Sequence, residues 1–190
     1  MILMLSGSLL MIPDTLVLPV ISTRSTDYVA EMPENRIIVA AYSEEDVGEM
    51  AVLIYRLKKL NEEFDTHFKV SSDAEKRIPE YLERILNEPD RFFVIVAAIG
   101  SKVVAVLKAD VRERISYEPP QDIRITDFYI APEHRRSGLG KRMISELKSQ
   151  MRSSGYKLLT VEFPTFNVIA KNFYMKEKFV ENITVLRYIE

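Results

Sequence analysis

The sequence contains no cysteine and only two histidines, His67 and His134. Without cysteine the chain can form no disulfide, and it offers neither a thiolate nucleophile nor a thiolate ligand for a metal ion. Two histidines give little support for a metal site, and we expect both to be ordinary surface or loop residues. The composition therefore excludes cysteine-dependent catalysis and predicts no bound metal.

The chain also lacks an excess of positive charge. Its 26 Lys and Arg residues against 28 Asp and Glu residues give a net charge of −2 at pH 7. Proteins that bind nucleic acids or membrane surfaces in general carry a basic excess. We therefore expect neither a nucleic acid nor a membrane as a partner, and any basic patch must be local.

The first apolar stretch, residues 1–12, is too short to span a bilayer before Pro13 and Asp14. No Lys or Arg precedes Arg24 to form the basic flank of a signal peptide. We therefore predict neither a transmembrane segment nor a signal peptide here, and we expect a cytoplasmic location.

The predicted domain organisation is simple. A chain of 190 residues, 47% of them hydrophobic and without internal repeats, fits one domain with a full core. We assign this domain to residues 36–190. Residues 1–35 form an N-terminal extension of uncertain role: either Met32 is the true start, or the extension is an arm that packs on the domain or on a partner.

Strand-like runs rich in β-branched residues recur along the domain. We expect strands at residues 36–41, 91–99, 102–111, 123–130, 157–163 and 183–189. Gly100-Ser101 between the second and third runs indicates a hairpin and hence antiparallel pairing. The last run alternates apolar and polar residues and is expected to close the sheet.

Helical spacing of apolar residues fills the intervals between these strands. One helix is predicted after an N-cap at Ser43, and a second after a capping box of Ser72 and Glu75. The linker between them, residues 62–71, is either the wall of a substrate pocket or a plain surface loop. Two more helices are expected at residues 139–154 and 167–178, the first of them ending at Gly155.

The most informative stretch lies between the predicted strand at 123–130 and the predicted helix at 139–154. It holds, in order, Arg135, Arg136, Ser137, Gly138, Leu139, Gly140 and Lys141. A glycine-bearing turn that opens a helix exposes unpaired backbone N–H groups, and the helix dipole adds about half a positive charge there. The pattern therefore predicts a phosphate-binding turn.

Two common phosphate motifs do not fit this turn. A P-loop would need glycine at Arg135 and Ser or Thr at Arg142, and a dinucleotide fingerprint would need a third glycine at Met143. The pattern Arg/Gln-x-x-Gly-x-Gly/Ala does fit, with Arg135, Gly138 and Gly140. This pattern resembles the acetyl-CoA pyrophosphate loop of the GNAT family of N-acetyltransferases.

The resemblance to this family extends over roughly residues 124–179. Further residues at the family's spacing are Asp127 to Ile130, Pro132 to Arg135, Val161 to Phe163, Asn167, Ala170, Tyr174 and Phe179. The sequence departs from the pattern at Arg136 and Lys178, where relatives often have glycine. The resemblance implies an α/β acyl-CoA N-acyltransferase fold, with a mixed, mostly antiparallel, splayed sheet flanked by helices.

The same resemblance implies roles for individual residues. The loop from Arg135 to Lys141 would hold the pyrophosphate of acetyl-CoA. Phe128, Tyr129 and Ile130 would free backbone groups for the pantetheine arm and an N–H for the oxyanion. Asn167 and Lys171 would add contacts to the cofactor, although Asn167 could equally be a helix cap. Tyr174 would bind near the thioester and protonate the departing thiolate.

The group that deprotonates the acceptor amine is harder to assign. Keeping a lysine-like amine neutral at pH 7 costs about 4.6 kcal/mol, against about 1.4 kcal/mol for an α-amino group. Asp127 stands at the position of an active-site carboxylate in the diamine acetyltransferases, and it is either the base or a structural hydrogen-bond acceptor. Thr126 and Arg124 stand where diamine and histone acetyltransferases have glutamate, which weakens both substrate assignments.

We therefore predict an N-acetyltransferase that moves an acetyl group from acetyl-CoA to a primary amine by direct attack in a ternary complex. The acceptor is a small molecule or a protein amine, and a homodimer is an open expectation. One alternative is a non-catalytic CoA-binding regulatory module, against which Tyr174 argues. A weaker one is a structural domain that only binds an anion.

Overall fold

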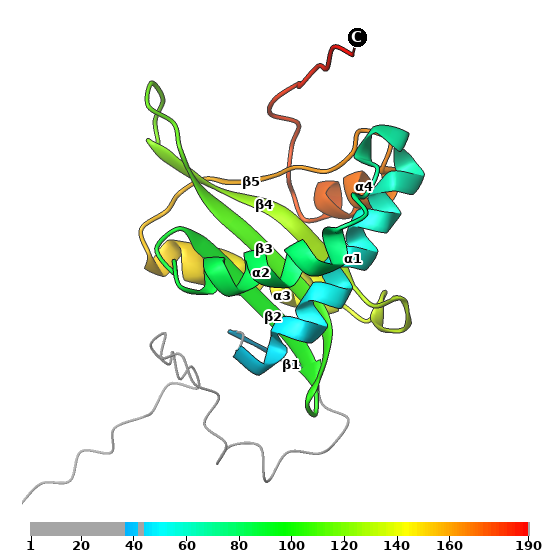
Figure 1. The fold of residues 1–190 in the computed structure, drawn as a ribbon. Coiled ribbons are helices and arrows are strands. Elements are labelled where there is room, and N and C mark those ends of the chain that lie inside the picture. Colours follow the sequence, from blue (N-terminus) through cyan, green and yellow to red (C-terminus); the bar gives the residue numbers. More distant parts are fainter. Residues whose placement is uncertain (1–36, 42–43, 190) are drawn as a thin grey trace, which may run out of the picture.

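The computed structural model describes residues 37–41 and 44–189, which form an α/β fold (Figure 1). The sheet within this part of the chain has five strands in sequence order. They are β1 (Ile37–Ala41), β2 (Phe92–Ile99), β3 (Lys102–Glu113), β4 (Gln121–Ile130) and β5 (Leu159–Val161). The first four pair antiparallel, and β5 pairs parallel with β4. The predicted hairpin is confirmed, with Gly100 in the left-handed region at φ 58°.

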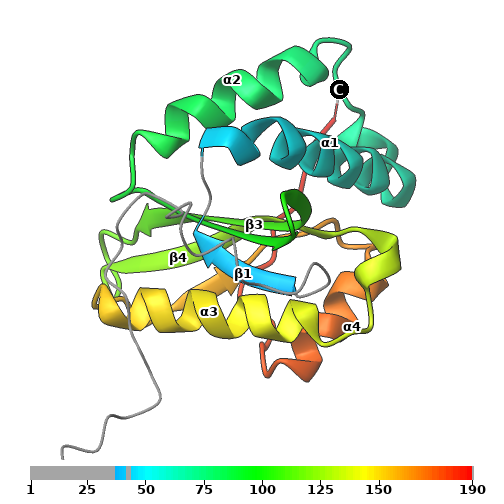
Figure 2. The ribbon, with the colours of Figure 1, turned by 90° about the horizontal axis from the view of Figure 1, so that it is seen from below.

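Helices cover both faces of this sheet (Figure 2). The described residues contain four α-helices, namely α1 (Val47–Phe64), α2 (Ala74–Leu86), α3 (Leu139–Ser153) and α4 (Val168–Lys176). α1 and α2 pack on one face around Met50, Ile54 and Leu82, while α3 packs on the other around Met143 and Leu147. The sheet thus separates two apolar cores, one on each face.

The starts of α1 and α2 differ from the prediction. A 3₁₀ turn, η2 (Glu44–Asp46), runs directly into α1, and the predicted N-cap at Ser43 lies outside the described residues. The predicted capping box of Ser72 and Glu75 is wrong, because Asp73 is the N-cap of α2. The Asp73 carboxylate makes no side-chain cap, since it accepts a hydrogen bond from Ser71 and lies near Arg77.

Strand β4 contains a bulge that controls which side chains reach the functional face. Its partners on β3 shift between Asp127, opposite Lys108, and Ile125, opposite Ala109, so Thr126 is the additional residue. The bulge reverses the side-chain alternation of the strand. Thr126 and Asp127 therefore both face the side of the sheet that α1 and α2 cover.

The sheet also splays open beyond this bulge. The pairing of β5 with β4 ends at Ile125 and Val161, while β4 continues to Ile130 against β3 alone. Backbone groups of residues 126–130 that point away from β3 therefore have no strand opposite them. The predicted mixed, mostly antiparallel, splayed sheet is confirmed.

Helices α3 and α4 end in the same backbone motif. The N–H of Tyr156 donates to Met151 and that of Gly155 to Arg152, with Gly155 at φ 84°. These bonds and the left-handed residue define a Schellman motif, as the sequence predicted for Gly155.

At the end of α4 the corresponding bonds run from Phe179 to Tyr174 and from Lys178 to Met175. Lys178 adopts φ 68°, a left-handed conformation that glycine adopts most easily. Lys178 therefore preserves the turn that relatives make with glycine, at a cost in backbone strain.

The predicted last strand, residues 183–189, is wrong. These residues form no strand, and their side chains are exposed. The segment makes two ion pairs with other elements: Glu181 pairs with Lys171 of α4 at 2.5 Å, and Arg187 pairs with Asp65, which follows α1, at 2.6 Å. The segment therefore leaves α4 and runs past the end of α1 (Figure 1).

The N-terminal extension, residues 1–35, lies outside the described residues. Its boundary with the domain and its role stay predictions. Among the helices of the described part, none combines the length and the apolar character that crossing a membrane requires.

Candidate active site

The predicted phosphate-binding turn connects β4 to α3 through a short 3₁₀ helix, η4 (Pro132–His134). Gly138 is the N-cap of α3 and has φ 81°, and Arg136 has φ 61°. The N–H groups of Leu139, Gly140 and Lys141 lie in the first helical turn, where no carbonyl of the helix can accept from them. Together with the helix dipole, these donors fit a pyrophosphate group.

Gly140 has a packing role in this turn. A Cβ atom at Gly140 would lie 3.1 Å from a ring carbon of Phe173 and 3.3 Å from Ile130. Phe173 belongs to α4 and Ile130 to β4, so a side chain at this position would push α3 away from both elements. The second glycine of the motif therefore brings three elements together at the splay.

The long side chains of the loop point less directly at a ligand than the motif suggests. The Arg135 Nε donates to the carbonyl of Ile130 at 2.8 Å, and its guanidinium lies 5.2 Å from the Tyr129 ring centroid. Ser137 donates to the carbonyl of His134 at 2.7 Å. The Arg135 contacts brace the loop against β4, and the backbone N–H groups of the first helical turn stay available as donors for an anion.

Phe128, Tyr129 and Ile130 lie on the splayed half of β4, as predicted. Tyr129 faces the core beneath α1, whereas Phe128 and Ile130 face the core that α3 and α4 complete. The Phe128 and Phe173 ring centroids are 5.8 Å apart, which fixes α4 beside the open part of β4. An extended arm laid along this edge would meet free backbone groups of β4.

Asn167 is the N-cap of α4, which confirms the cap assignment for this residue. Its side-chain oxygen accepts from the N–H of Ala170 at 2.9 Å, and only 7% of the residue is exposed. Lys171, one turn further on, is exposed and forms its ion pair with Glu181. A contact of either residue with a cofactor stays a prediction.

Tyr174 is packed among aromatic side chains. Its ring stacks on Phe163 at 5.6 Å between centroids and meets Phe173 and Phe179 edge-on at 5.1 Å and 5.2 Å. Burial raises the pKa of the Tyr174 phenol above its ordinary value, so the phenol keeps its proton at neutral pH. The aromatic surroundings hold the Tyr174 ring, with its protonated hydroxyl, in the core on the α3 side of the sheet.

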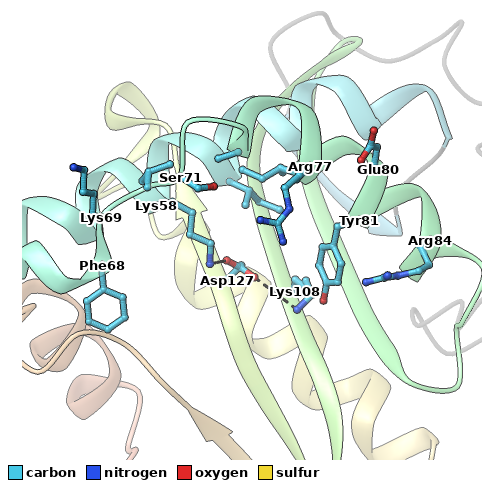
Figure 3. A pocket seen from close by; sticks show the side chains of 14 residues that line it. Lys58, Phe68, Lys69, Ser71, Arg77, Glu80, Tyr81, Arg84, Lys108 and Asp127 are labelled. Atoms are coloured by element: carbon cyan, nitrogen blue, oxygen red, sulfur yellow. Dashed lines mark hydrogen bonds and ion pairs between the residues drawn. The ribbon is translucent and has the colours of Figure 1, made fainter. Parts of the chain in front are cut away.

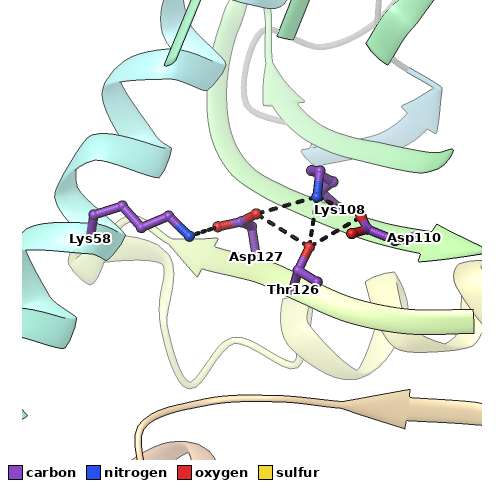
Figure 4. A network of polar contacts seen from close by, with 5 residues as sticks. All are labelled: Lys58, Lys108, Asp110, Thr126 and Asp127. Atoms are coloured by element: carbon purple, nitrogen blue, oxygen red, sulfur yellow. Dashed lines mark hydrogen bonds and ion pairs between the residues drawn. The ribbon is translucent and has the colours of Figure 1, made fainter. Parts of the chain in front are cut away.

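Asp127 lies at the centre of a polar network on the other face of the sheet (Figure 4). One carboxylate oxygen accepts from Lys58 of α1, while the other lies 3.7 Å from Lys108 Nζ and accepts from Thr126 at 3.3 Å. Lys108 also donates to Asp110 at 2.5 Å and to Thr126 at 2.7 Å. Asp127 thus acts as a hydrogen-bond acceptor here, and its role as a base stays a prediction.

Lys108 is the most buried charge of this network, with 2% of the residue exposed. Burial would lower its pKa, but the charges of Asp127 and Asp110 outweigh this effect and raise the pKa above its ordinary value. Its Nζ also lies 5.4 Å from the Tyr81 ring centroid. Lys108 therefore remains a cation beneath α2.

A cavity of about 600 Å³ opens above Asp127 and Lys108 (Figure 3). Its walls come from α1, α2, the segment between these helices, and strands β3 and β4. Phe68 of the predicted linker lines it, as do Lys69, Val70 and Ser71. The linker therefore does wall a pocket, and the pocket has the size of a small-molecule site.

Most residues of this pocket were not predicted from the sequence. Lys58, Lys108 and Tyr81 were not singled out, although Lys108 interrupts a run of otherwise apolar residues in β3. A charge inside a strand that is buried on both sides is a signal that could have identified it. The lysine on α1 and the tyrosine on α2 carry no such signal, because each has ordinary helical surroundings in the sequence.

The comparison with protein families decides the identity of this fold. The family described as the acetyltransferase (GNAT) family matches residues 54–179, which is more than half of the 190 residues. The chain belongs to this family. Acetyl-CoA is the cosubstrate of GNAT acetyltransferases, and the turn before α3 and the open edge of β4 fit its binding. No curated protein sequence matches the chain significantly.

Solved structures share the fold at low sequence identity. A predicted acetyltransferase from Clostridium acetobutylicum, crystallised with acetyl-CoA, has 13% identity and a TM-score of 0.67, over 81% of this chain and 96% of its own. An aminoglycoside 6′-N-acetyltransferase from Acinetobacter haemolyticus has 19% identity and a TM-score of 0.65, over 80% and 97%. Glucosamine-6-phosphate N-acetyltransferase from Arabidopsis thaliana has 16% identity and a TM-score of 0.62, over 82% and 100%.

Proposed function

We propose that the chain transfers an acetyl group from acetyl-CoA to a primary amine by direct attack in a ternary complex. One observation carries this proposal: the free edge of β4 connects the phosphate-binding turn on one side with the Asp127 pocket on the other. A thioester laid along that edge and an amine in the pocket would meet at residues 126–130.

Each group of residues has a proposed role that follows from its position in the fold. The first-turn N–H groups of α3 bind the pyrophosphate, and the exposed edge of β4 orients the arm that carries the thioester. Acetyl-CoA, when bound, supplies an activated acetyl group. A backbone N–H of β4 donates to the carbonyl oxygen as negative charge develops on it. Asp127 holds the acceptor amine over this edge and is the proposed acceptor of the proton that the amine loses as the C–N bond forms.

Tyr174 donates a proton to the leaving thiolate in this proposal. Its raised pKa keeps the hydroxyl protonated, so the group starts in the form that an acid requires. The same raised pKa makes complete transfer to a thiol, of pKa about 8.5, unfavourable. A strong hydrogen bond that shares the proton late in bond breaking is therefore its proposed contribution.

The main alternative, a non-catalytic CoA-binding module, differs in needing no acceptor site. The cavity of about 600 Å³ beside the free edge favours the enzyme. Release of free CoA from acetyl-CoA should be followed over a panel of primary amines, with a product mass measured for each hit. CoA binding without amine-dependent release from any member of the panel would support the module instead.

A further inference from the structure

Cationic side chains outnumber anionic ones in the lining of the acceptor pocket. Five of its lining side chains are cationic and two are anionic, a formal excess of three positive charges in a chain whose net charge is −2. The cations are Lys58, Lys69, Arg77, Arg84 and Lys108, and the anions are Glu80 and Asp127. Concentrated charge of one sign in a concave site raises the local concentration of ligands of opposite charge.

The two acids that line the pocket do not neutralise the cations of α2, Arg77 and Arg84. Asp127 is engaged by Lys58 and Lys108 at the floor. Glu80 pairs with Lys76 at 3.9 Å, and Figure 3 shows its carboxylate turned away from Asp127. Asp127, together with Asp110 on Lys108, therefore compensates two of the five lining cations, whereas the exposed Glu80 forms only a loose pair with Lys76, which does not line the pocket.

The remaining cations sit around the mouth of the pocket. Figure 3 shows the guanidinium of Arg77 turned toward Asp127 and Tyr81, and that of Arg84 beside Tyr81. Arg77 has Asp73 at 3.8 Å, an exposed and loose ion pair that leaves its donors largely available. Guanidinium groups bind carboxylates and phosphates through paired hydrogen bonds.

We infer that the acceptor is a small primary amine that carries an anionic group. Its amino group lies at Asp127 beside β4, and its carboxylate or phosphate lies between Arg77 and the neighbouring cations of α2. This assignment rests on the proposed acetyltransferase function and names the substrate class of that same site. Polycationic amines are excluded as good substrates, because each additional ammonium group would enter a field of the same sign.

Matched amine pairs test the charge preference directly. Glucosamine 6-phosphate against glucosamine adds a phosphate, β-alanine against β-alaninamide adds a carboxylate, and spermidine supplies a polycation. The second-order rate constant kcat/KM is measured for each, divided by the fraction of neutral amine. We expect the kcat/KM of the anionic amine in at least one pair to exceed that of its neutral partner by about tenfold or more. The pair with the larger ratio shows whether the site prefers a phosphate or a carboxylate.

Two glutamine variants connect this preference to the pocket. Arg77→Gln should reduce the ratio of anionic to neutral kcat/KM by about tenfold, chiefly through KM. Arg56→Gln removes the same charge from an exposed residue of α1 that does not line the pocket, and its ratio should stay at the wild-type value. A higher kcat/KM for spermidine or for both neutral amines would overturn the inference while leaving the acetyltransferase intact.

A binding measurement separates failure of the inference from failure of the function. Calorimetry of glucosamine 6-phosphate and β-alanine with the CoA-bound protein detects the anion site without turnover. Binding that Arg77→Gln weakens, with no acetylation of any amine, would refute the enzyme and support the anion site. Acetylation of neutral amines, with no preference for anionic amines and no binding that depends on Arg77, would support the enzyme and refute the anion site.

Discussion

Tyr174 is a residue whose packing and proposed chemistry can be separated by removing one atom. Tyr174→Phe keeps the ring among Phe163, Phe173 and Phe179. We expect a loss of turnover of about 10²- to 10⁴-fold, because one acid is missing, with little change in melting temperature. Tyr156→Phe, in the same core, is the control and should keep its rate. Wild-type turnover in Tyr174→Phe, with the chemical step rate-limiting, would leave water as the proton source.

Lys178 illustrates strain that a single substitution should relieve. The left-handed backbone of Lys178, with φ 68°, destabilises the fold by about 1–2 kcal/mol. Glycine avoids this strain, although it loses more conformational entropy on folding. We therefore expect Lys178→Gly to raise the free energy of unfolding by about 0.5–1 kcal/mol, as measured by urea denaturation.

Lys176→Gly is the matched control, because Lys176 is the last residue of α4 in helical conformation. That substitution should lower the free energy of unfolding by up to about 1 kcal/mol. Equal destabilisation by both changes would show that the turn after α4 carries no strain.

The turn that opens α3 makes a prediction at the level of an element. Gly138→Val places a β-branched residue at φ 81° and a side chain over the first-turn N–H groups. Loss of one or two hydrogen bonds to a charged group should weaken CoA binding by about ten- to a hundredfold, as measured by calorimetry.

Gly100→Val separates strain from binding in this experiment. Gly100 also has positive φ, but it lies in the hairpin between β2 and β3. We expect a comparable loss of stability and an unchanged affinity for CoA. If a folded Gly138→Val protein binds CoA as tightly as the wild type, the backbone N–H groups of this turn do not contribute to CoA binding.

Elements whose signals are local could be predicted from the sequence. The hairpin at Gly100, helix α3 and its end at Gly155 follow from residue types within a few positions. The bulge at Thr126 could not be predicted, because it depends on how β4 registers against β3. The same bulge brings Asp127 to Lys58 and Lys108, so these contacts on the acceptor side could not be predicted, although Asp127 itself and the linker at residues 62–71 were named from the sequence.

The prediction of residues 183–189 failed for a related reason. Their alternation is real, but alternation specifies a strand only where a partner edge is reached. The segment does not reach the edge of the sheet, and it makes ion pairs through Glu181 with Lys171 and through Arg187 with Asp65. By contrast, the cofactor side follows a contiguous motif from Arg135 to Lys141, which is why the resemblance to a family found it.

At the scale of the whole molecule, β4 is shared by two sites with opposite requirements. On the α3 side the backbone N–H groups would be the donors for a pyrophosphate, and on the α1 and α2 side charged side chains line the proposed acceptor pocket. Where β4 and β5 no longer pair, a ligand on one face of the sheet can meet a ligand on the other face between these two strands. Both sites therefore depend on the interrupted pairing of β4 with β5.

The C-terminal segment bears on whether the molecule is a homodimer. Val185, Leu186 and Tyr188 are 84%, 88% and 87% exposed, a cluster of apolar surface along one short segment. Such a cluster favours burial against a second copy. We expect light scattering at micromolar concentration to give the mass of a dimer, and replacement of these three residues by serine to give that of a monomer. Ile115→Ser with Tyr117→Ser, two exposed apolar residues between β3 and β4, should leave the dimer unchanged. A wild-type chain that is monomeric under these conditions would contradict the dimer and leave the exposed segment as a feature of the single chain.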